Sequence, residues 1–262
     1  MSQDKSDPKH VLTLFASARA DGALSATSYQ ALTTVDLGAQ IQAGLGISVD
    51  DVQASEVVLL TMMPDDSGSM GVHTDAVCEG HNLVLDALRA CQQRDAILAH
   101  TRYLNGDVLF PYRPLDQAAR MDRANYCANK GTPLYDQSVV LLGSVMAKAR
   151  ELEASGVVAR SVTLILTDGA DCHSVRAKAR DVASLVHDLT RIEGHIVAAM
   201  GIADGGTDFR TVFRNMGIDD RWILTPANDA GSIRKAFQMF SQSAVRVSQA
   251  KAPGVSLGGF GG

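Results

Sequence analysis

Two continuous apolar runs stand out in the chain, at residues 57–63 and 162–166, and polar residues follow each of them directly. A strand without alternation between polar and apolar positions is typical of a parallel sheet, in which both faces are covered. Both runs therefore predict central strands. Shorter apolar segments at 196–202 and 222–224 predict two more strands.

Helical periodicity fills the segments between these strands. Apolar residues recur at spacings of three and four positions, which places them on one face of a helix. Glycines directly after several of these segments are typical of helix ends. The pattern predicts a helix that contains Val77, Val84, Leu88 and Cys91, and further helices over 134–155, 174–192, 208–216 and 229–247, with Ser174 as the cap of its helix.

The turn Asn105-Gly106-Asp107 separates two more strand patterns, at 96–104 and 108–112. Asn-Gly between such patterns is a strong signal for a tight hairpin. Strands joined by helices need crossover connections, which make neighbouring strands parallel and place helices on both faces. The predicted fold class is α/β, a doubly wound, mostly parallel sheet with one antiparallel edge strand. Ligands of such sheets bind beyond the carboxyl ends of the strands, where the strand order reverses.

The alternation of strands and helices covers only the middle of the chain. The sequence therefore predicts one α/β domain with a separate segment before it and another after it. Residues 51–250 are expected to form the α/β domain. Residues 1–50 do not alternate in this way and are expected to form an extension that packs on the core, with a short strand or helix at 10–16. The tail, 251–262, is rich in glycine and is expected to be flexible.

Composition narrows the class of protein. The apolar fraction of 46% excludes a disordered chain. Lys and Arg number 24 against 29 Asp and Glu, so the net charge is −5 and no nucleic-acid partner is expected. No apolar run approaches the ~20 residues that span a bilayer. The polar start leads into no signal-like segment, which predicts a cytoplasmic protein with no membrane partner. The four cysteines form no C-x-x-C pair and are expected to be buried and unpaired.

Oxygen-bearing side chains follow the two central strands. Asp65, Ser67 and Ser69 come after the first strand with the spacing D-x-S-x-S, and Asp168 follows the second. Thr132 lies between them in sequence, just before a predicted helix. Two carboxylates and three hydroxyls suit Mg²⁺, Mn²⁺ or Ca²⁺ better than Zn²⁺ or Cu²⁺. Because two carboxylates only neutralise a divalent ion, the ion can still accept an acidic side chain from a partner protein.

Three motifs resemble the metal-ion-dependent adhesion site (MIDAS) of von Willebrand factor type A (vWA) domains: Asp65-x-Ser67-Gly68-Ser69, Gly131-Thr132-Pro133-Leu134 and Thr167-Asp168-Gly169. The resemblance covers residues 56–250. It implies a vWA, Rossmann-like fold and metal-dependent protein binding without catalysis, hence no catalytic residues. It also implies that Asp65, Ser67 and Ser69 ligate the metal, that Thr132 binds directly or through water, and that Asp168 acts through water. The final helix resembles bacterial intracellular members associated with tellurite resistance and stress signalling.

The first strand departs from the family pattern. In vWA domains this strand leads straight into the first Asp, whereas Met62-Met63-Pro64 precedes it here, so we expect the strand to end early. The long polar stretch at 112–130 is expected to give the site a specialised rim.

Several residues beside the motifs have simpler interpretations. Asp66 is expected to face solvent or to cap a turn, and Asp136 to lie at the positive end of a helix dipole. Together with Asp171, both are also candidates for supporting the metal ligands. His73 and His173 follow two of the motif loops and are expected at the rim of the site.

Two other functions stay open. Asp65 stands at a strand end, as the nucleophile of an aspartyl phosphotransferase does, which makes a metal-dependent phosphohydrolase an alternative. Such an enzyme needs a nearby lysine, and none occurs between Lys9 and Lys130. A structural subunit of a larger assembly is the other alternative.

A group of arginines is a candidate nucleic-acid patch, since aromatic residues are interleaved with it. Asp107, Asp116 and Asp122 offset its charge, so we interpret the segment as a solvated loop. The arginines are Arg102, Arg113, Arg120 and Arg123.

Overall fold

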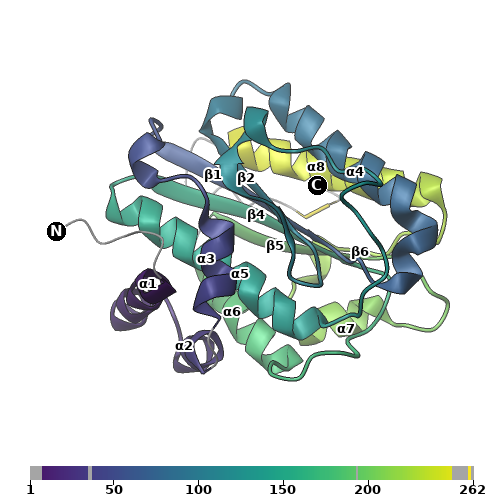
Figure 1. Ribbon diagram of the computed structural model, residues 1–262, viewed down its shortest axis with the longest axis horizontal. Coiled ribbons are helices and arrows are strands. Elements are labelled where there is room, and N and C mark those ends of the chain that lie inside the picture. The colour runs from purple at the N-terminus through teal and green to yellow at the C-terminus, as the bar shows by residue number, and fades with distance from the viewer. Residues whose placement is uncertain (1–7, 35–36, 193, 250–258, 261–262) are drawn as a thin grey trace.

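A six-stranded sheet forms the centre of the molecule, in the order β3-β2-β1-β4-β5-β6 (Figure 1). The computed structural model describes residues 8–34, 37–192, 194–249 and 259–260. All neighbouring strands are parallel except β2 and β3, which form the antiparallel hairpin. The predicted fold class is therefore confirmed. The strands are β1 (Glu56–Pro64), β2 (Ile97–Arg102), β3 (Val108–Pro114), β4 (Val158–Thr167), β5 (His195–Gly201) and β6 (Ile223–Leu224).

Helices cover both faces of this sheet. On one face α4 (Thr74–Arg89) packs along α8 (Ala230–Gln249), and α5 (Leu134–Ala154), α6 (Ala179–Arg191) and α7 (Phe209–Asn215) lie on the other (Figure 1). The α4–α8 pair is close because Gly80 has no side chain, and a Cβ there would lie 2.0 Å from the Phe237 ring. Both central strands are buried along almost their whole length, as their unbroken apolar runs predict.

The first fifty residues add helices outside α5 and α6. These are α1 (Pro8–Ala20), α2 (Ala26–Thr33) and α3 (Gly38–Leu45), so the weakly periodic segment near 10–16 is helical. Val11 and Phe15 of α1 are fully buried in the main core. The Ser25 N–H donates to Asp188 of α6 at 2.7 Å, which ties α2 to the α/β domain.

Two of the sequence-based boundaries are wrong. The strand β1 does not end early but continues through Pro64, whose carbonyl accepts the Leu104 N–H at 3.1 Å. The next N–H, that of Asp65, donates to Leu166 at 2.9 Å, so β1 and β4 stay paired up to the loops. Ser174 does not cap α6, which begins at Ala179; its hydroxyl accepts the N–H groups of Tyr135 and Asp136 at the start of α5 instead.

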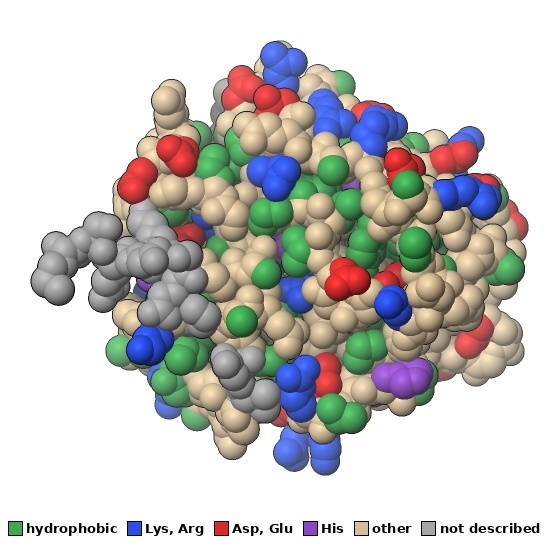
Figure 2. Space-filling view, in the orientation of Figure 1, with side chains coloured by type: hydrophobic (Ala, Val, Ile, Leu, Met, Phe, Trp, Pro, Cys, Tyr) green, Lys and Arg blue, Asp and Glu red, His purple; other side chains and the backbone are tan. Residues whose placement is uncertain are grey.

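Most of the predicted flexible tail lies outside the described residues. Gly259 and Phe260 are described, and the Phe260 ring packs edge-on against Trp222 at 5.3 Å. No helix of the described residues is long and apolar enough to cross a membrane. Charged side chains of both signs are interspersed on the face that Figure 2 displays.

Candidate metal centre

Three loops meet at the carboxyl ends of β1 and β4. From this pair the chain continues to β2 on one side and to β5 on the other, so the strand order reverses here. Lys130 bridges the first two loops, because its carbonyl accepts the Gly68 N–H at 3.2 Å and its N–H donates to the Asp66 carbonyl at 3.1 Å. The Thr132 carbonyl accepts the N–H of His173 at 3.3 Å, which attaches the third loop.

Side-chain contacts connect four of the five predicted ligands. The Ser69 hydroxyl donates to Asp168 Oδ1 at 2.7 Å, and the hydroxyls of Ser67 and Ser69 are 3.1 Å apart. The Ser67 N–H donates to Asp65 Oδ1 at 2.7 Å, while Thr167 donates to the other oxygen of Asp65 at 2.6 Å. The structure therefore brings two carboxylates and two serine hydroxyls into one connected group.

Thr132 joins this group through its backbone. Its N–H donates to His173 Nδ1 at 2.8 Å, and it lies two residues after Lys130, which bridges to Ser67. The Thr132 side chain is buried, and its hydroxyl makes no hydrogen bond with any described residue. All five predicted residues thus lie at the same end of the sheet, and the Thr132 hydroxyl is uncommitted.

The carboxylates of this group are buried without a positive partner. Asp65 has no exposed surface and Asp168 is 7% exposed. Within the described residues, no Lys, Arg or His forms an ion pair with Asp65, Asp66 or Asp168. Burial raises the pKa of Asp65, hydrogen bonds from Thr167 and Ser67 oppose the shift, and the charge of Asp168 adds to it. A buried negative charge that lacks a counter-ion fits a bound cation.

The donor set fits a hard cation. The described residues contain no group of three or more His, Cys, Asp or Glu side chains arranged to hold a metal. Any metal here would depend on hydroxyl oxygens besides the two carboxylates, and such ligands suit Mg²⁺ and related hard ions. Ser69 is exposed, so the group opens to solvent on one side.

Asp66 departs from its prediction, because it is 2% exposed and does not face solvent. It accepts the N–H of Asn105 at 3.0 Å, in the turn of the β2–β3 hairpin. Burial raises its pKa to about 6, and the nearby charge of Asp65 contributes. His73 is also buried, whereas His173 lies exposed at the rim as expected.

Two supporting contacts have no clear signal in the sequence. The Tyr126 hydroxyl donates to the Asp65 carbonyl, and its ring packs on Tyr103 at 5.7 Å. Asp136 lies in the first turn of α5, as predicted, but its carboxylate also accepts the N–H groups of residues 175–177 at 2.6–3.1 Å. It thereby fixes the loop that follows Asp168. Thr167, by contrast, lies within the motif Thr167-Asp168-Gly169, but the motif does not indicate that its hydroxyl donates to Asp65.

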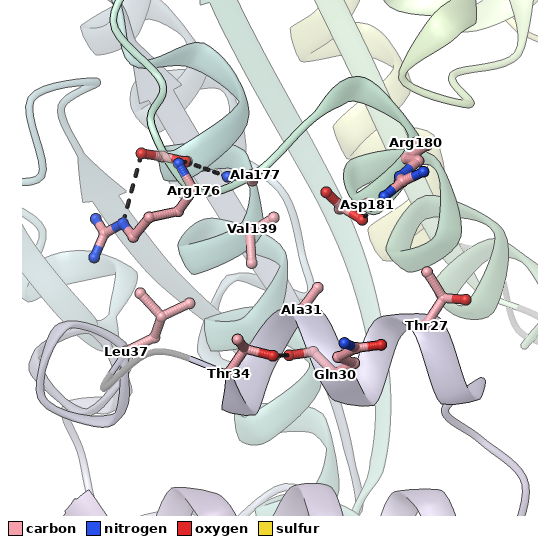
Figure 3. A pocket seen from close by; sticks show the side chains of 11 residues that line it. Thr27, Gln30, Ala31, Thr34, Leu37, Val139, Arg176, Ala177, Arg180 and Asp181 are labelled. Carbon is pink, nitrogen blue, oxygen red and sulfur yellow. Dashed lines mark hydrogen bonds and ion pairs between the residues drawn. The ribbon is translucent and has the colours of Figure 1, made fainter.

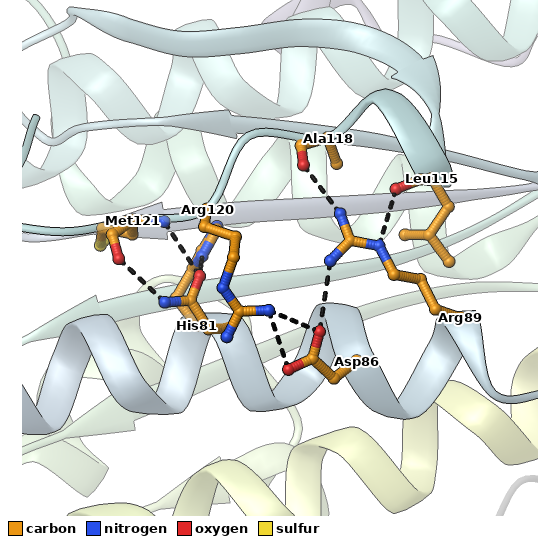
Figure 4. A network of polar contacts seen from close by, with 8 residues as sticks. His81, Asp86, Arg89, Leu115, Ala118, Arg120 and Met121 are labelled. Carbon is orange, nitrogen blue, oxygen red and sulfur yellow. Dashed lines mark hydrogen bonds and ion pairs between the residues drawn. The ribbon is translucent and has the colours of Figure 1, made fainter.

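The arginine-rich segment does not form an open basic surface. Arg120 and Arg89 both bind the Asp86 carboxylate (Figure 4), and Arg123 pairs with Asp75 at 2.6 Å. Arg102 is not in a solvated loop but fully buried, where it donates to the Gly106 carbonyl at 3.1 Å.

The prediction that all four cysteines are buried is wrong in part. Cys78 and Cys91 are buried, whereas Cys127 and Cys172 are exposed. All four are unpaired, as the sequence predicts.

Comparisons with known proteins give a likeness of fold. No protein-family model and no curated protein matches the chain. The pilus adhesin SpaC from Lactobacillus rhamnosus GG matches over 74% of this chain with 12% identity and a TM-score of 0.54, and the match covers 30% of the adhesin. This chain thus spans about a third of the length of that structure. At 12% identity the likeness shows the fold alone.

Two further structures match less well. Proximal thread matrix protein 1 from the mussel byssus has 15% identity and a TM-score of 0.49, covering 73% of this chain and 47% of that one. The VWA domain of SpRpn10 has 7% identity and a TM-score of 0.47, covering 75% and 98%. Another structure of the mussel protein carries zinc in its MIDAS motif. Scores below 0.5 are too low to establish a shared fold.

Proposed function

We propose that this chain is a vWA domain whose MIDAS holds a divalent cation, and that the cation binds an acidic side chain of a partner protein. The observation that carries the proposal is the connected group of Asp65, Ser67, Ser69 and Asp168, whose buried carboxylates lack a positive partner. Mg²⁺ is the first candidate, with Mn²⁺ and Ca²⁺ as alternatives, because all ligands are hard oxygens.

The residues divide into direct and indirect ligands. Asp65, Ser67 and Ser69 would hold the ion directly, and Asp168 would act through Ser69 and water, since its oxygen already accepts the Ser69 hydroxyl. Thr132 supplies the uncommitted hydroxyl. The cation supplies an electrophilic position toward solvent, where a carboxylate completes its coordination.

The surface around the site favours a protein as the partner. Val72 and Val175 lie on two of the site loops and are 84% and 87% exposed, more than any other large apolar side chain of the described residues. A partner that covers them gains apolar burial in addition to the contact with the metal.

We propose that the chain is a binding module and not an enzyme. A phosphohydrolase would need Asp65 as an accessible nucleophile, but this carboxylate is fully buried and both of its oxygens accept hydrogen bonds. On the motif resemblance alone, we extend the proposal to a cytoplasmic stress-response or signalling assembly.

Calorimetric titration with Mg²⁺ tests the metal site, and peptide display on the immobilised chain tests the partner. We expect saturable Mg²⁺ binding that Asp65→Ala weakens at least about 100-fold, and Mg²⁺-dependent selection of peptides with Asp or Glu. Asp116→Ala, at an exposed carboxylate elsewhere, is the matched control and should bind normally. Equal Mg²⁺ affinity in Asp65→Ala contradicts the metal site. Peptides that stay bound in EDTA contradict the partner mode and favour a structural subunit.

A further inference from the structure

A cavity of about 440 Å³ lies between α2 and the start of α6 (Figure 3). One wall is a face of α2 that includes Thr27, Gln30 and Ala31, and the opposite wall comes from α5 and residues 176–181. None of the five candidate metal ligands lines the cavity. This volume is typical of pockets that bind small molecules.

Arg176 is an exposed cation on the wall of this cavity, and its guanidinium forms an ion pair with Asp136 but no close hydrogen bond. Its Nε lies 3.6 Å from Asp136 Oδ2, which is too long for a hydrogen bond (Figure 3). The Asp136 carboxylate is instead satisfied by three backbone N–H groups at 2.6–3.1 Å. Among the residues that the structure describes, nothing accepts a hydrogen bond from the Arg176 side chain. Its planar set of donors is therefore available to a ligand.

The other charged groups of the cavity are Arg180 and two carboxylates, those of Asp136 and Asp181. Arg180 stands at the mouth, 80% exposed and 3.8 Å from Asp181, again beyond hydrogen-bond distance. One oxygen of Asp181 accepts the Lys178 N–H at 2.8 Å, which reduces its capacity for a ligand. The remaining lining mixes the polar residues Thr27, Gln30 and Thr34 with apolar ones, which include Leu37 and Val139. Two guanidinium groups that make no hydrogen bond with the described residues, beside the apolar side chains of Leu37 and Val139, favour a ligand that has an anionic end and a short apolar stem.

We propose that this cavity binds a small organic oxyanion, a carboxylate or a phosphate, with Arg176 as its anchor. Both groups present paired oxygens that match the guanidinium fork. The anionic end binds Arg176, and the stem lies over Val139 and Leu37. Arg180 supplies a second positive charge at the entrance.

Amide NMR of the full chain tests this site with four probes. Butyrate and butyl phosphate carry an oxyanion on an apolar stem, butanol has the stem alone, and inorganic phosphate has the charge alone. We expect saturable shifts of the amides at 27–34 and 175–181 with at least one of the first two probes. Butanol and inorganic phosphate should each bind at least about tenfold more weakly. The tighter of butyrate and butyl phosphate identifies the source of the oxyanion.

Two substitutions locate the binding. Arg176→Gln should weaken the tighter probe about tenfold or more, whereas Arg94→Gln, at a guanidinium similarly placed 3.6 Å from Asp95 on the surface, should have no effect. Ala31→Asp puts a repelling carboxylate into the cavity and decides the question if Arg176→Gln does not fold. The proposal is overturned if the shifts never saturate, or if a folded Arg176→Gln or Ala31→Asp chain binds the probe as tightly as the unmodified protein.

Discussion

The two ends of the sheet differ in whether their buried charges have a partner of opposite charge. At the amino end, Lys148 is fully buried and donates to the Ile47 carbonyl at 2.5 Å and to Glu151 at 3.0 Å. At the carboxyl end, Asp65 and Asp168 are equally hidden but have no positive partner within the described residues. Burial of a charge alone therefore does not identify a functional site; the missing counter-charge does.

The largest expected effect lies at the amino end. Lys148→Met removes a buried cation and leaves the Ile47 carbonyl and Glu151 Oε2 without this donor, while His10 Nε2 stays 3.0 Å from Glu151 Oε1. We expect the free energy of unfolding to fall by about 3–5 kcal/mol, as for other broken buried pairs. Urea unfolding monitored by circular dichroism measures it, and Arg94→Met at an exposed position is the control. An unchanged free energy of unfolding would show that the ion pair of Lys148 with Glu151 does not stabilise the fold.

The next largest effect is the pH dependence of stability that comes from His195, at the start of β5 and so at the amino end of the sheet. Burial lowers the pKa of His195 to about 4, and its Nδ1 lies 2.8 Å from the Ser161 hydroxyl. Because the unfolded chain has the higher histidine pKa of ~6.5, this contribution is complete above that pH and is lost as the pH falls toward 4. We expect about 3 kcal/mol less loss between pH 7 and 4 in His195→Gln than in the unmodified chain. Parallel urea titrations give the difference, and equal slopes contradict it.

At the carboxyl end, removal of charge should stabilise the metal-free protein. Asp65→Asn keeps the shape of the side chain but removes a buried charge that has no counter-ion. In EDTA we expect the variant to gain about 1–3 kcal/mol. Added Mg²⁺ should then raise the melting temperature of the unmodified chain only. If Asp65→Asn destabilises the metal-free chain, other groups of the protein stabilise the Asp65 carboxylate without a cation.

The smallest expected effect concerns the rim of the metal site. Val72→Ser combined with Val175→Ser should weaken a peptide selected by display about three- to tenfold, because its contact loses apolar area. Val158→Ser is the matched control, since Val158 is 58% exposed at the start of β4, away from the site loops. Fluorescence polarisation with the labelled peptide provides the affinities. An equal loss in the control would exclude a specific contact.

Local patterns predicted the parts of the fold that depend on neighbours in sequence. The apolar runs gave the central strands, and Asn105-Gly106 gave the hairpin. Ser174 was misassigned because its oxygen caps α5, nearly forty residues earlier, rather than its own helix. Asp66 was misassigned for the same reason, since the N–H that it accepts belongs to Asn105. Polar side chains whose partners are distant in sequence leave no local signal.

The contact between Ser69 and Asp168 joins residues 99 positions apart. Such a long-range contact closes a large loop, and its entropy cost is met only when the strands between are in place. A cation at the proposed site could not nucleate folding of a nascent chain, since Asp168 joins Ser69 only when β1 and β4 are paired. Its binding rate in a refolding experiment would therefore report the last step of assembly rather than the first.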